Sequence, residues 1–179
     1  SISDAIARKV SDDYAARSAE AAEINAFAED IMDRERVLLG LIALADRERV
    51  LVLRHFREGT VSNRTITSHL ALVGRIADQA RTKGRTGYNR SARRIVSFGK
   101  LFRLAQWLKI DLPLRIVVAD RFERLLLTRI VLNELIEFNS NRIKPLLGDR
   151  VASILHETLD IRREDIVQGM DDMLIQYPD

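Results

Sequence analysis

Hydrophobic residues along this chain recur mostly at helical spacing, and no segment is a convincing strand. A wide apolar arc covers residues 34–57, and Ile66, Leu70, Val73 and Ile76 then repeat at intervals of three or four. The chain has 3 Pro and 8 Gly among 179 residues, so there are few points at which a helix would be interrupted. The pattern predicts an all-α fold with short connections.

About six helices are expected. Apolar periodicity and candidate capping residues place them at 3–32, 34–57, 62–83, 91–109, 113–143 and 149–177, with a loop at 84–90. The first helix has a thin, Ala-rich apolar side, so we expect an N-terminal helical arm over residues 1–33 and a helical bundle over 34–179. The expected core includes Leu38, Leu41, Ile42, Leu51, Leu70, Phe98, Phe102, Phe122, Leu125, Leu132 and Ile154.

Composition excludes several classes of protein. The absence of cysteine excludes disulfides and thiolate metal sites. The apolar run Val37–Ala45 is far shorter than the roughly 18 residues needed to cross a bilayer, so we expect no membrane span. The amino terminus lacks the features of a secretory signal, and we interpret it as the start of a helix cut from something larger.

No arrangement of residues predicts catalysis or metal binding. His55, His69 and His156 are far apart and stand in no metal-ligand spacing, so helix-surface roles are favoured for them. Asp120 and Glu123 lie at i, i+3, where pairing with nearby arginines on a solvated helix is favoured over chemistry. Phosphate-binding and dinucleotide-binding glycine motifs are absent. The sequence therefore predicts a protein that is not an enzyme and has no metal or cofactor.

Charge is distributed unevenly, although the formal net charge is only +3. Residues 79–110 carry nine Lys or Arg and no acidic residue, whereas residues 1–35 carry nine acidic residues and four basic ones. Such a basic segment can attract a polyanion, either a nucleic acid or an anionic membrane. It can equally match acidic segments of the same chain or of a sister chain.

Candidate contact residues lie in the expected loop and on both sides of it. Tyr88 is favoured as the surface aromatic of this segment, because Phe98, Phe102 and Trp107 lie close to one helical stripe and are assigned to the core. The candidate residues for binding an anionic lipid or another partner are Arg81, Lys83, Arg85, Tyr88, Arg90, Arg93 and Arg94.

Several stretches carry a resemblance to a known family. They read YAAR, VLVLRHFREGTVS, GRTGYNRSARRIVSF, FRLAQWL, ADRFERLLL, FNSNRIKPLLGDRV and IQYPD. Together they resemble the cytosolic region that follows the transmembrane part of bacterial sodium/proton exchangers of the cation:proton antiporter-1 family. The resemblance is closest to members whose cytosolic tail continues into a cyclic-nucleotide-binding domain.

The resemblance implies a non-catalytic regulatory, coupling and dimerisation domain on the cytoplasmic side of the bacterial inner membrane, as part of a membrane protein. The implied partners are the transmembrane exchanger domain of the same polypeptide, a second copy in a homodimer, the anionic membrane surface and a following cyclic-nucleotide-binding domain. Ion-binding aspartates of the family lie in transmembrane helices, so no transport residue is carried over to this chain.

The alternative is a stand-alone helical protein that binds nucleic acid through the basic residues of segment 81–103. Acidic flanks, which would repel phosphates, and the lack of a clear helix-turn-helix disfavour it.

Overall fold

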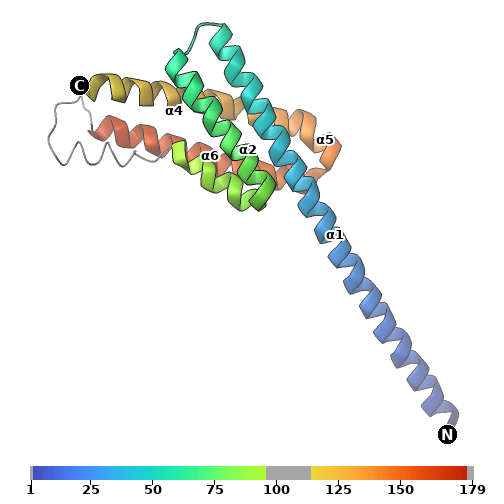
Figure 1. The fold of residues 1–179 in the computed structure, drawn as a ribbon. Helices are drawn as coiled ribbons and strands as arrows, with labels where there is room; N and C mark the ends of the chain where they lie inside the picture. The colour runs from blue at the N-terminus through green and yellow to red at the C-terminus, as the bar shows by residue number, and fades with distance from the viewer. Residues whose placement is uncertain (1, 96–113, 177–179) are drawn as a thin grey trace. The chain divides into compact units, whose positions relative to one another are not determined.

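The computed structural model describes the backbone of residues 2–95 and 114–176, and the side chains chiefly of residues 29–95 and 119–173. These residues form helices joined by short turns, without a strand among them (Figure 1). The elements are α1 (Ile2–Arg57), α2 (Asn63–Ala92), the 3-10 turn η1 (Arg93–Ile95), α4 (Leu114–Phe138), the π-helical turn η2 (Asn139–Ile143), α5 (Lys144–Leu147) and α6 (Asp149–Gln176). The prediction of an all-α fold is confirmed.

The predicted number of helices is not confirmed, because the described residues contain four long helices rather than six. The helices expected at 3–32 and 34–57 form the single helix α1. Most of the helix expected at 91–109 lies outside the described residues. The last helix begins at Asp149, as expected, and Pro145 lies in the first turn of the short α5 instead of following the end of a longer helix. Proline is tolerated there because the first-turn N–H groups of a helix have no partner within it.

The chain divides into two compact units, Ser1–Arg36 and Val37–Asp179. In the first unit, Arg34 pairs with Asp30 one turn earlier at 2.9 Å, on the helix surface. The second unit, called the bundle below, has one hydrophobic core that draws on α1, α2, α4 and α6.

The core of the bundle follows the expected apolar faces in most places. Four of the expected core residues are fully buried: Leu41, Leu51, Leu125 and Leu132. Four are partly buried: Leu38, Ile42, Leu70 and Ile154. The prediction for Phe122 is wrong, because its side chain is 38% exposed on the outer face of α4. Phe98 and Phe102 lie outside the described residues.

Helix α2 changes direction at Gly84. This residue has a φ of 56° and a ψ of −143°, and it is the residue with non-helical angles inside α2. Glycine adopts a positive φ without the steric cost that a Cβ would add. The expected loop at 84–90 is therefore wrong: the chain turns at Gly84 and continues as helix to Ala92 (Figure 1). Gly87 then packs directly against the backbone of Gln79.

Replacing Gly87 by Ala should destabilise the protein by about 1–3 kcal/mol, as overpacking does in other proteins. The added Cβ would overlap the backbone carbonyl of Gln79, which has little freedom to move. Gly74→Ala is the matched control, because Gly74 lies in the same helix and has open space around it. That variant should gain about 0.5–1 kcal/mol from helix propensity. Urea denaturation measures both, and equal effects would contradict the close packing at Gly87.

Candidate functional site

Three of the candidate basic residues pair with carboxylates of the bundle itself. Arg81 lies 3.2 Å from Asp78, Arg85 lies 3.0 Å from Glu157 and Arg93 lies 3.3 Å from Asp165. Arg85 also donates from Nε to the Thr158 hydroxyl at 2.9 Å. Two of these carboxylates belong to α6, so two arginines that follow Gly84 fasten the basic segment to that helix. The contacts of these three arginines therefore fit the interpretation in which the basic segment pairs with acidic residues of the same chain.

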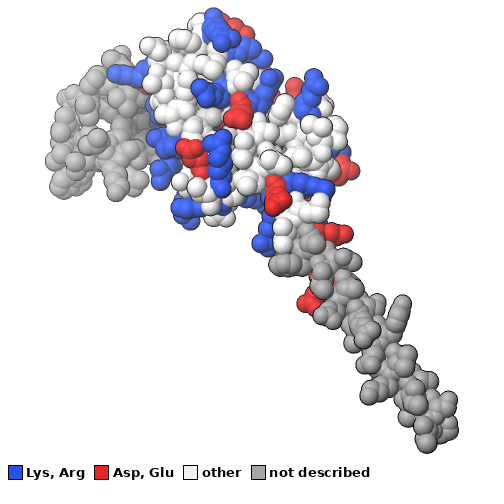
Figure 2. All heavy atoms as spheres, turned by 45° about the vertical axis from the view of Figure 1, so that its right-hand side comes forward, with Lys and Arg blue, Asp and Glu red and all other residues white. Residues whose placement is uncertain are grey.

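The remaining candidate cations, Lys83, Arg90 and Arg94, are exposed. Figure 2 shows Lys and Arg side chains interspersed with Asp and Glu over the visible face of the bundle, so they form no single uninterrupted basic patch there. Lys83 and Arg90 are the better candidates for meeting an anionic partner, because Arg81, Arg85 and Arg93 are already partly neutralised and Arg94 also has an interaction within the protein.

The prediction that Tyr88 lies on the surface is wrong. Its side chain is fully buried, and its hydroxyl accepts a hydrogen bond of 2.9 Å from Arg162 Nη1. The Arg162 guanidinium also lies 5.6 Å from the centre of the tyrosine ring. The reversal at Gly84 explains the error, because it returns residues 85–92 to the core instead of leaving them in a loop. Tyr88 is therefore unavailable to a lipid or a nucleic acid.

A buried polar network around Glu48 joins α1, the two parts of α2 on either side of Gly84, and α6. Arg162 of α6 donates to both carboxylate oxygens of this α1 residue, each at 2.8 Å, in the bidentate geometry that suits a guanidinium. Nε2 of His69 lies 3.1 Å from Glu48 Oε1. With Tyr88, these residues form what we call the Glu48 network, and none of the four side chains is more than 3% exposed.

The charges of the Glu48 network stabilise one another. Burial by itself would raise the pKa of Glu48, but the charge and hydrogen bonds of Arg162, together with the hydrogen bond from His69, outweigh it and lower the pKa to about 2. Burial raises the pKa of Tyr88. For Arg162, the Glu48 charge opposes the effect of burial and raises the pKa above its ordinary value. The network is therefore an ion pair with a neutral phenol beside it.

His69 is a second correction, because a helix-surface role was expected and the ring is fully buried. An ionised carboxylate only accepts hydrogen bonds, so His69 Nε2 carries the hydrogen that points to Glu48. Within the described residues, His69 Nδ1 and Arg162 Nε have no hydrogen-bond partner. A network closed to solvent in this way offers no access to a substrate, and its chemistry fits the positioning of helices.

The turn between α1 and α2 is held by carboxylates of α4. Glu134 accepts hydrogen bonds of 2.6 Å from Arg54, and Arg64 donates to Asp120 at 2.9 Å. Glu123 accepts from the Ser62 backbone at 2.7 Å and from its hydroxyl at 2.8 Å. Thr65 also bonds to Glu123, and this bond contributes most to lowering the pKa of that carboxyl. These acidic residues thus have structural partners in α1, α2 and the turn between them, whereas pairing with nearby arginines of their own helix was expected.

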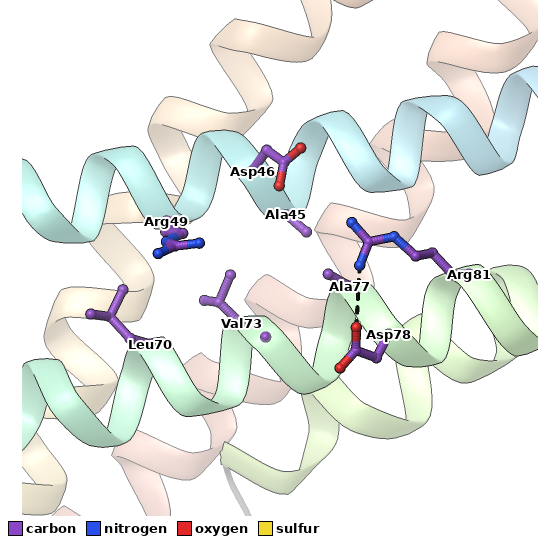
Figure 3. Close-up of a pocket in the computed structure, with 9 residues that line it drawn as sticks. Ala45, Asp46, Arg49, Leu70, Val73, Ala77, Asp78 and Arg81 are labelled. Atoms are coloured by element: carbon purple, nitrogen blue, oxygen red, sulfur yellow. Dashed lines mark hydrogen bonds and ion pairs between the residues drawn. The ribbon is translucent and has the colours of Figure 1, made fainter.

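A groove of about 370 Å³ lies between α1 and α2. Its floor consists of small or aliphatic residues, namely Ala45, Leu70, Val73, Gly74 and Ala77. Two acidic and two basic residues line the rest, as Figure 3 shows: Asp46, Arg49, Asp78 and Arg81. Because these charges balance and Arg81 is paired with Asp78, the groove favours neither an anion nor a cation.

Within the described ranges, no group of three or more potential ligands is placed to hold a metal ion. No described helix has a stretch long and apolar enough to span a membrane. Comparisons with protein-family models, curated proteins and solved structures found no match to this chain.

Proposed function

We propose that this chain is a non-catalytic regulatory, coupling and dimerisation domain on the cytosolic side of a bacterial sodium/proton exchanger. The observation that carries the proposal is the set of sequence stretches that resemble the cytosolic region of the cation:proton antiporter-1 family. The implied partners are the exchanger's transmembrane domain, a second copy, the anionic membrane surface and a following cyclic-nucleotide-binding domain.

The positions of these stretches in the bundle support an architectural role. The stretch at 50–62 contains the turn after α1, and the stretch at 119–127 contains Asp120 and Glu123, two of the carboxylates that hold this turn. The stretch at 84–98 includes the reversal at Gly84 and Tyr88 of the Glu48 network. The residues that carry the resemblance thus make contacts between helices. Such contacts are expected of a non-catalytic domain that couples the movements of its neighbours.

The exposed side chains of Lys83 and Arg90 can bind an anionic membrane surface by electrostatic attraction. Anionic headgroups attract Lys and Arg close to a cytoplasmic surface by about 1 kcal/mol for each residue that reaches it. Lys83 and Arg90 lie on either side of Gly87, whose packing against Gln79 holds this part of α2 in place. Binding through these residues is expected to be weak and to disappear at high salt, because the Debye length falls to about 3 Å at 1 M salt.

Replacing Lys83 and Arg90 together by Glu should remove most of the protein's binding to vesicles that contain anionic lipid. Co-sedimentation at low salt measures the bound fraction, and thermal unfolding should change little because both side chains are exposed. Arg57→Glu with Arg142→Glu is the matched control: it changes the same charge at two exposed arginines outside the basic segment, and it should retain at least half of the binding.

Equal losses in the two double variants would show that net charge alone matters and would contradict a membrane-facing role of the basic segment. If the wild-type protein ignores the vesicles but binds duplex or single-stranded nucleic acid with a steep salt dependence, the nucleic-acid alternative replaces the exchanger proposal.

A further inference from the structure

The part of α2 after Gly84 and the turn η1 are attached to α6 by two ion pairs and a buried hydrogen bond between them. The first pair joins Arg85 to Glu157 at 3.0 Å, and the second joins Arg93 to Asp165 at 3.3 Å. The contacts follow the same order along both elements. The segment therefore runs along the surface of α6 for about two helical turns.

The hydrogen bond differs from the two ion pairs in its burial. Tyr88 accepts it from Arg162, and neither side chain is more than 3% exposed. In each ion pair, by contrast, one side chain lies mostly in solvent: Glu157 is 63% exposed and Arg93 is 66% exposed. The ion pairs can therefore break by reorientation of side chains while the buried contact keeps the helices in place.

Partly exposed ion pairs of this kind are weak and can exchange partners. Two charges near water gain little from pairing, and dissolved salt screens much of what they gain. The phosphate of a lipid headgroup offers a guanidinium an equivalent partner, because it can accept two N–H groups at once, as a carboxylate does. Glu157 and Asp165 therefore compete with an anionic surface for the arginines that they hold.

We propose that α6 masks Arg85 and Arg93 and so limits binding of the basic segment to an anionic membrane surface. This inference rests on the proposed function for the identity of that surface, and it adds how binding there is regulated. While the ion pairs are closed, Lys83 and Arg90 make the contact. When the pairs open, two further guanidinium groups of the same segment join it, so the contact with α6 is autoinhibitory.

Neutralising the two α6 carboxylates, by Glu157→Gln with Asp165→Asn in the full chain, should release both arginines. Affinity for vesicles that contain anionic lipid should rise about fivefold, measured by co-sedimentation at low salt. Glu137→Gln with Asp171→Asn is the matched control. It makes the same two chemical changes at exposed carboxylates that form no ion pair within the described residues, and its affinity should rise less than twofold.

Replacing the two arginines separates their release from the change in net charge. In the wild-type protein, Arg85→Gln with Arg93→Gln should lower vesicle affinity less than twofold, because α6 already holds both guanidinium groups. In the variant with Glu157→Gln and Asp165→Asn, the same two changes should abolish the fivefold gain. The difference between the two backgrounds is the coupling between the arginines and the carboxylates.

The proposal is overturned if the two carboxylate variants bind vesicles equally, or if the arginine changes weaken binding equally in both backgrounds. Should the double carboxylate variant fail to fold, Asp165→Asn alone is compared with Asp171→Asn, and equal affinities again overturn the proposal. Failure of the exchanger proposal is distinguishable, because the wild-type protein then ignores the vesicles. Masking is in that case measured on a heparin column: the variant with Glu157→Gln and Asp165→Asn should elute at higher salt than the control, and equal elution overturns the masking.

Discussion

Replacing Arg162 by Met is expected to lower the free energy of unfolding by about 3–5 kcal/mol, the usual loss when one partner of a buried ion pair is removed. The change leaves the Glu48 carboxylate buried with His69 as its remaining polar neighbour. It also removes the donor to the Tyr88 hydroxyl. Urea denaturation at neutral pH measures the loss, and a change below 1 kcal/mol would show that the network does not hold the helices together.

The double variant Glu48→Met with Arg162→Met is the control, because it removes both charges and fills the site with side chains of similar length. It should recover much of the stability lost in Arg162→Met, since a buried ion pair replaced by apolar groups is often neutral. No recovery would mean that Arg162→Met acts by disturbing packing rather than by leaving a charge unpaired.

The loss of unfolding free energy in the Arg162→Met variant should also depend on pH. In the wild-type protein the pKa of Glu48 is lowered from 4.5 to about 2, so its contribution is present above pH 4.5 and is lost as the pH falls toward 2. Without Arg162, burial dominates and raises the pKa of Glu48 above 4.5, so the folded variant binds the proton more readily than the unfolded chain. The difference in stability between the two proteins should therefore shrink as the pH is lowered from 7 to 4.

Leu132→Ala should cost about 2–5 kcal/mol, which combines the lost transfer free energy with that of the cavity left behind. Leu132 is fully buried on the side of α4 that faces the core. Leu126→Ala is the matched control, since it makes the same change on the same helix at a side chain that is 40% exposed. The control should cost less than about 1 kcal/mol, as expected for a surface position.

Thermal and urea denaturation of the two alanine variants measure the difference. Similar losses at Leu132 and Leu126 would contradict the orientation of α4, because one of these leucines must face the core and the other solvent. A loss at Leu126 larger than at Leu132 would also contradict the assignment of Leu132 to the core.

Much of the fold was predictable because burial along a helix repeats with the helical period. Leu41, Leu51, Leu125 and Leu132 were identified as core from spacing alone. Phe122 was assigned to the core in the same way, but wrongly, because hydrophobicity does not reveal which apolar side of α4 faces inward when a second side is also apolar. The continuity of α1 was missed for a related reason: charged residues near 33 interrupt an apolar face without ending a helix.

A signal for the Glu48 network is present in the sequence, although it was not recognised. Glu48 lies between the buried residues Ala45 and Leu51, and Arg162 between Leu159 and Ile166, at the spacing of core positions. A charged residue at such a position predicts a buried partner of opposite charge. Spacing did not identify that partner, because Glu48 and Arg162 are 114 residues apart.

By itself, the sequence determined that the chain is helical, that several leucines such as Leu41 and Leu132 are buried and where positive charge accumulates, because these properties depend on neighbours within a few turns. Only the tertiary structure decided that Tyr88 is internal and that Arg85 and Arg93 meet carboxylates of α6. The physical reason is that these outcomes depend on the reversal at Gly84 and on pairings across more than 70 residues. Local periodicity carries no information about which helices a reversal brings together.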